Sequence, residues 1–273
     1  MFAHEFVRNA YLAGTLIALA CGLTGYFVVL RGQVFAGDAL SHVAFAGALA
    51  AAALGVDQRV GLFIATALVA GGMGSLGERA RADDVVIGTA FAWILGLGVF
   101  FLSLFDASGH GGNGLTGAHA LFGSVFGLSV GAAALAAAVG LAVCVALVAV
   151  ARPLLFATID PVVALARGVP VRLLGLLFLL LVAIVAAEAT QAVGALLLLG
   201  LLAAPAGAAQ RLTANPFRGL ALSGALAVVS MWAGLALSYA IGSLPPSSAV
   251  IGVSVLAFLL AGVAARLRPI IAR

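Results

Sequence analysis

The chain has 273 residues and a mass of 27.0 kDa, with 64% hydrophobic residues, 8% charged residues and a mean hydropathy of +1.27. A soluble domain carries about 25% charged residues, and one core of ordinary size cannot remove this much apolar surface from water. The composition therefore excludes a soluble enzyme, a nucleic-acid-binding protein and a disordered chain, and it leaves an integral protein of the lipid bilayer. The net charge of +4 comes from 13 Arg and no Lys, and we attribute it to cytoplasmic loops.

Long apolar runs follow one another along almost the whole chain. A helix that crosses a bilayer needs about 20 mainly apolar residues, and the runs do not alternate like the strands of a membrane barrel. We predict an all-α, multi-pass membrane protein that forms a single transmembrane domain over residues 1–273, with eight to ten spans and a possible further half-helix at Leu121–Ser129. The nine spans, in chain order, are Tyr11–Leu30, Val34–Leu54, Val60–Gly77, Val85–Phe105, Val130–Val150, Leu173–Ala187, Ala192–Ala209, Leu220–Ile241 and Ala249–Ala265.

Arginine placement predicts the orientation of these spans. With nine spans, four groups of Arg fall on one side, which the positive-inside bias makes cytoplasmic. The same count places the N-terminus and the loop Asp106–His119 on the outer side. The four groups are Arg79 with Arg81, the Arg152–Arg172 loop, Arg211 with Arg218, and the C-terminal Arg266, Arg268 and Arg273.

The second predicted span contains two ionisable residues, Asp38 and His42. Such groups are costly inside a bilayer, where they usually serve function. Four residues apart, they share one helix face about 6 Å apart along the axis. A carboxylate oxygen and an imidazole nitrogen suit a divalent transition metal. The alternative is that Asp38 only caps a helix that begins after Gly37, with His42 paired to it.

A third ionisable residue, Glu188, lies at the outer end of the sixth predicted span, at the start of Glu188–Gln191. Because these residues fall between two predicted spans, we interpret Glu188 as a solvated loop carboxylate near the membrane surface.

The loop from Thr158 to Arg172 has the signals of a short helix. Asp160 is a favoured N-cap, Pro161 suits the first helical position, and Gly168 suits the C-terminal stop. Val163 and Leu165 make this cytoplasmic helix apolar. Two interpretations remain open: the helix docks into a cytoplasmic partner protein, or it lies in the lipid interface.

The chain contains no phosphate-binding loop of the G-x-x-x-x-G-K-[ST] type, because it has no Lys. If ATP drives transport, the nucleotide must therefore bind another polypeptide.

Several segments resemble, in one order, the membrane permeases of zinc/manganese/iron ABC transporters. They are Val29–Gly32 followed by Gly-Asp-Ala-Leu-Ser-His at 37–42, Leu-Phe-Gly-Ser at 121–124, Asp160–Gly168, and Gln-Ala-Val-Gly-Ala-Leu-Leu at 191–197 with Pro205–Ala206. The segment Ser243–Ser248 departs from the family pattern, in which an acidic residue and a Gly are common.

The resemblance implies a permease in the cell membrane that is not itself an enzyme. It implies separate ATP-binding subunits docked at Asp160, Pro161, Val163, Leu165 and Gly168, an extracytoplasmic metal-binding protein, and the pairing of two permeases as a homodimer. Asp38 and His42 would line the path of a transported zinc, manganese or ferrous ion, with no permanently bound cofactor. One rival is a secondary metal carrier with proton sites at Asp38 and Glu188. A second rival, an intramembrane metalloprotease, is disfavoured because no H-E-x-x-H occurs.

Overall fold

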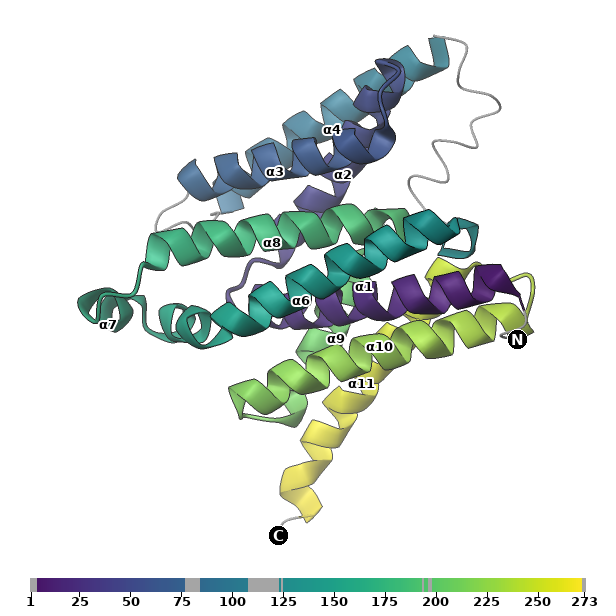
Figure 1. Cartoon of the computed structure of the whole chain (residues 1–273). Helices are drawn as coiled ribbons and strands as arrows, with labels where there is room; N and C mark the ends of the chain where they lie inside the picture. The colour runs from purple at the N-terminus through teal and green to yellow at the C-terminus, as the bar shows by residue number, and fades with distance from the viewer. Residues whose placement is uncertain are drawn as a thin grey trace.

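The structure is a computed structural model that describes residues 4–76, 84–107, 123, 125–192, 194–195 and 198–271. Every regular element in these ranges is helical, which confirms the predicted all-α class (Figure 1). In chain order the elements are α1 (Glu5–Leu30), α2 (Val34–Ala53), α3 (Gln58–Leu76), α4 (Asp84–Ala107), the 3-10 turn η3 (Val125–Gly127), α6 (Val130–Ile159), α7 (Pro161–Ala166), α8 (Val171–Ala192), α9 (Leu198–Leu212), α10 (Pro216–Ala240) and α11 (Pro246–Ile271).

Seven of the described helices are long and apolar enough to cross a membrane: α1, α2, α4, α6, α8, α10 and α11. The remaining two predicted spans correspond to α3 and α9, and their crossing stays a prediction. The 15 residues of α9 give a helix of about 22 Å, which is shorter than the hydrocarbon core of about 30 Å.

Two predicted boundaries change in the structure. The run Ala192–Ala209 is not one helix, because Ala192 ends α8 and α9 begins at Leu198. The backbone of Gly194, between them, has a φ of +93°, a left-handed conformation that interrupts a right-handed helix and that glycine adopts without strain. Of the half-helix expected at Leu121–Ser129, Leu121, Phe122 and Ser124 lie outside the described residues, and Val125–Gly127 forms the 3-10 turn.

Helix α1 lies at the centre of the fold and packs against α6, α8, α9 and α10 (Figure 1). Helix α2 packs against α3, α4 and α8, so α8 lies between the α2–α4 group and the helices around α1. The largest buried side chains include Phe27 of α1, Leu40 of α2 and Phe178 of α8. The core therefore joins the helix that carries Asp38 and His42 to the rest of the molecule.

Small residues let α1 approach its neighbours closely. At the crossing with α10, the Ser223 hydroxyl donates a hydrogen bond of 2.6 Å to the carbonyl oxygen of Gly22. At the crossing with α9, the Cα of Gly25 faces the backbone of Leu202, and an added Cβ would collide with the Leu202 carbonyl oxygen. Between membrane helices there is no hydrophobic driving force, because the surrounding lipid is equally apolar. Glycine at these crossings instead permits close van der Waals contact, which holds the helices together.

Gly25→Ala should therefore destabilise the protein strongly, because backbone atoms of α9 cannot move aside as a flexible side chain can. Overpacking of a core costs about 1–3 kcal/mol. The matched control is Gly71→Ala in α3, where an added Cβ meets nothing within 4 Å and alanine gains helix propensity. Thermal unfolding in detergent should show a lowered midpoint for Gly25→Ala alone; equal midpoints for the two variants would contradict this packing.

Candidate metal path and docking helix

A tight turn sets the start of α2. The N–H of Gly32 bonds to the carbonyl of Val29 at 3.1 Å, and the N–H of Gln33 bonds to that of Val28 at 2.9 Å. This is the Schellman pattern, and Gly32 has the left-handed φ, +67°, that it requires. Helix α2 then begins at Val34, with Gln33 at the N-cap position.

Asp38 is consequently a residue of the helix interior. A capping side chain accepts hydrogen bonds from the free backbone N–H groups at the start of a helix. Asp38 comes after the first turn of α2, so the alternative that it caps a helix starting after Gly37 is wrong. The hydrogen bond from the Gly37 N–H to the Gln33 carbonyl, at 3.4 Å, shows that the helix is already formed there. An ionisable group in this position requires another explanation.

Asp38 and His42 both face α4. Asp38 is half-buried and lines an open pocket of about 230 Å³ with Phe35 of α2 and Ile87, Gly88 and Phe91 of α4. The imidazole of His42, also half-buried, meets the ring of Phe91 edge to face, with centroids 5.1 Å apart. The carboxylate and the imidazole interact electrostatically. The shared helix face predicted from their spacing is thus present.

The two residues would supply only part of the coordination sphere of a metal ion. Within the described part of the chain, no group of three or more His, Cys, Asp and Glu side chains is placed to hold a metal ion. A carboxylate oxygen and an imidazole nitrogen at the edge of a pocket would leave an ion with other ligands, such as water. This arrangement suits brief contact with a passing ion better than permanent retention.

Sequence reasoning missed Ser41, which lies between Asp38 and His42. The fully buried Ser41 hydroxyl is 3.1 Å from the carbonyl oxygen of Ala195, in the interrupted segment between α8 and α9. Backbone outside a helix is tolerated at membrane depth only where protein or a water-filled cavity surrounds it. Ser41 therefore ties the broken backbone to the helix that carries the candidate ligands. A polar residue between two candidate ligands was the available signal, although its partner depends on the fold.

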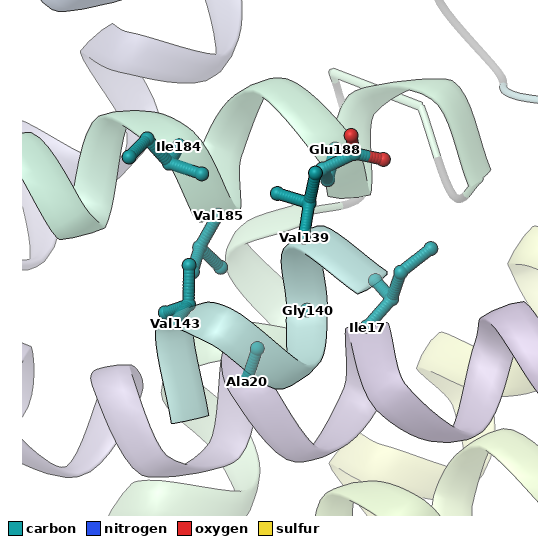
Figure 2. A pocket seen from close by; sticks show the side chains of 8 residues that line it. All are labelled: Ile17, Ala20, Val139, Gly140, Val143, Ile184, Val185 and Glu188. Carbon is teal, nitrogen blue, oxygen red and sulfur yellow. The ribbon is translucent and has the colours of Figure 1, made fainter. Parts of the chain in front are cut away.

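Glu188 is not the solvated loop residue expected from the sequence. Helix α8 continues to Ala192, and Glu188 is only 5% exposed. It lines a cavity of about 10 Å³ with apolar residues of α1, α6 and α8 (Figure 2), which is about the smallest cavity that can hold one water molecule. Among the described residues the Glu188 carboxylate has no hydrogen bond or ion pair, and the charge of Arg59 on α3 reaches it from a distance. Glu188 and Asp38 line different pockets, which share no residue.

The short helix between Thr158 and Arg172 forms as the sequence predicts. Helix α7 begins at Pro161, the Asp160 carboxylate accepts a hydrogen bond of 3.0 Å from the Val163 N–H, and Gly168 has a φ of +80°. Figure 1 shows α7 at one end of the bundle, projecting beyond α6 and α8.

One face of α7 is buried and the other is open. Ala164 is fully buried against the bundle, whereas Val162, Val163 and Leu165 are 64%, 43% and 52% exposed. Three exposed apolar side chains on a helix of six residues form a surface that a partner protein or lipid must cover.

Comparison with known proteins identifies relatives over nearly the full length. Residues 3–265 match the ABC 3 transport family. The manganese transport system membrane protein MntC of Halalkalibacterium halodurans is 31% identical over 236 residues, which are 86% of this chain and 79% of that protein. A probable iron transport system membrane protein of Haemophilus influenzae is 27% identical over 86% of this chain and 85% of its own length.

A solved structure has the same fold. The structure of PsaBC from Streptococcus pneumoniae in complex with a Fab matches with a TM-score of 0.82 over 95% of this chain and 92% of that chain, at 24% identity.

Proposed function

Because the chain belongs to the ABC 3 transport family, we propose that it is the membrane-spanning permease subunit of an ATP-driven importer of a divalent transition metal ion. The observation that carries the metal assignment is the pair Asp38 and His42, which lie one turn apart on α2: Asp38 lines the pocket against α4, and His42 packs on Phe91, which lines the same pocket. The relatives named for manganese and iron transport support manganese or ferrous iron as cargo. Zinc accepts the same ligand types.

The side chains of α2 provide the chemistry of a path. The Asp38 carboxylate attracts a divalent cation and replaces one of its water ligands, and the imidazole of His42 adds a nitrogen ligand. Two protein ligands bind weakly enough for the ion to leave when the path opens to the other side. The chain acts as a permease and leaves ATP hydrolysis to its partners.

The partners follow from the same proposal. An ATP-binding subunit docks on the exposed face of α7, a metal-binding protein delivers the ion on the outer side of the cell membrane, and a second permease copy completes the transporter. A gradient-driven carrier would need none of these partners, and no relative reported above is named as one.

The purified chain alone should hydrolyse no ATP, because its sequence has no phosphate-binding loop and no Lys to contact the nucleotide phosphates. When the tagged permease is isolated from its own membranes under mild conditions, a separate ATP-binding polypeptide should co-purify with it. ATP hydrolysis should be found only in the fractions that contain this polypeptide. The negative control is the same preparation after a wash that strips the partner. Steady hydrolysis by the stripped permease, or a transport-competent preparation without a second polypeptide, would contradict the proposed function.

A further inference from the structure

Arg31 joins three helices at the end of the bundle where α7 lies. Its Nε donates a hydrogen bond of 3.0 Å to Oε1 of Gln33. Its Nη1 is 3.4 Å from the hydroxyl oxygen of Thr158, near the end of α6. The guanidinium carbon lies 5.2 Å from the centre of the Phe178 ring on α8. One half-buried side chain thus touches the start of α2, the end of α6 and a ring in the interior of α8.

Each contact reaches a part of the proposed transport machinery. Gln33 is the N-cap residue of α2, the helix of Asp38 and His42. Thr158 is followed, after Ile159, by Asp160, whose carboxylate caps the docking helix α7. Phe178 is 1% exposed and packs edge to face against Phe27 of α1. Arg31 therefore connects the base of the docking helix to the base of the metal-path helix.

The links on both sides are short and stiff. The Schellman turn at Gly32 fixes the direction from α1 into α2, and the Thr158 hydroxyl also bonds to the Leu154 carbonyl of its own helix at 2.6 Å. A displacement of the end of α6 therefore acts on the Arg31 guanidinium rather than being absorbed by a loose side chain. Packed side chains and hydrogen bonds of this kind carry coupling when the element has two arrangements.

The buried amide of Gln33 points to a second arrangement. Gln33 is 3% exposed, and among the described residues its Nε2 has no hydrogen-bond partner, although its Oε1 is engaged by Arg31. Buried polar groups are nearly always paired, and an exception requires an explanation. A shift of α2 relative to α6 would change the partners available to this donor.

We propose that Arg31 is the positioning residue that transmits the movement of α7 to α2, and so couples ATP hydrolysis to opening of the metal path. This inference rests on the proposed function. Arg31 touches no metal ion; it acts through Gln33 on one side and Thr158 on the other. Its planar guanidinium group contacts both partners at once, which a lysine ammonium cannot do in the same geometry.

The test uses the complete transporter, which is the permease with its ATP-binding subunits, in proteoliposomes loaded with ATP and with the metal-binding protein added outside. Manganese taken up and ATP hydrolysed are measured together, so that their ratio reports coupling. Arg31→Gln and Arg31→Lys should each lower this ratio about fivefold or more, the usual lower range of coupling between two sites, while ATP hydrolysis continues. Arg218→Gln is the matched control, because Arg218 is an exposed arginine at the start of α10 and its loss removes the same charge.

A second variant covers the case in which Arg31→Gln does not fold. Thr158→Val keeps the shape of the side chain and removes the oxygen that Arg31 faces, so it should lower the ratio in the same direction, and the double variant should add little to either single change. An unchanged ratio in the folded variants would overturn the inference. So would a parallel loss of transport, ATP hydrolysis and bound ATP-binding subunit, because that pattern describes a merely structural residue. Absence of ATP-dependent uptake by the unmodified transporter would instead refute the proposed function itself.

Discussion

Asp38→Asn should depress metal uptake about 10- to 100-fold, although the substitution keeps the size and shape of the side chain. Loss of even an outer partner of a metal ligand costs that much, and here the charge that attracts the cation is removed. The structure excludes a capping role for Asp38, since α2 begins at Val34. His42→Ala should act in the same direction, because it removes the proposed nitrogen ligand that packs on Phe91 at this pocket.

Uptake of labelled manganese in cells carrying each variant at matched membrane abundance provides the measurement. Glu188→Gln is the control, because it removes the negative charge of another intramembrane carboxylate that lines a different pocket. We expect its uptake to stay close to that of the unmodified protein, whereas a proton-driven carrier that used Glu188 would lose activity. Normal uptake by Asp38→Asn would mean that the metal path lies elsewhere.

Val163→Asp and Leu165→Asp should uncouple ATP hydrolysis from transport while the permease remains in the membrane. Both side chains are exposed on α7, and burial of an unpaired polar or charged group in an apolar contact costs about 2 kcal/mol or more. That cost lowers the affinity for the ATP-binding subunit more than about tenfold. The amount of this subunit that co-purifies with the permease, and the metal moved per ATP, are the two readouts.

The control for these variants is Leu267→Asp near the end of α11, where the side chain is 47% exposed and the predicted orientation is also cytoplasmic. It should leave both readouts unchanged, because α7 is the proposed contact and α11 is not. If coupling survives both changes in α7, the exposed face of this helix lies against lipid, and the ATP-binding subunit docks at another place.

The features that the sequence predicts well are those set by local physics. Continuous apolar runs predict membrane helices because the bilayer leaves the backbone few alternatives. The docking helix was predictable because Asp160, Pro161 and Gly168 each act within a few residues of their own position. The common face of Asp38 and His42 follows from helical spacing alone.

The features that the sequence did not predict depend on contacts between distant segments. The sequence analysis placed the end of this helix at Ala187, five residues before α8 ends at Ala192, because a glutamate after an apolar run looks like a helix end. Glu188 is instead enclosed by α1 and α6. The bond from Ser41 to Ala195 joins residues 154 positions apart, and that from Arg31 to Thr158 joins residues 127 apart. No local sequence pattern indicates which distant residues form such hydrogen bonds.

ATP-driven import of a metal ion by this permease is tested by uptake into proteoliposomes that contain the permease with its ATP-binding subunits, with the metal-binding protein supplied on the outer side. Manganese should accumulate against its gradient when ATP is available to the subunits at the α7 side, and it should not accumulate when ATP is replaced by a non-hydrolysable analogue. An imposed proton gradient without ATP should drive no uptake. Accumulation driven by the proton gradient alone, or ATP-dependent accumulation of no divalent metal, would contradict the account.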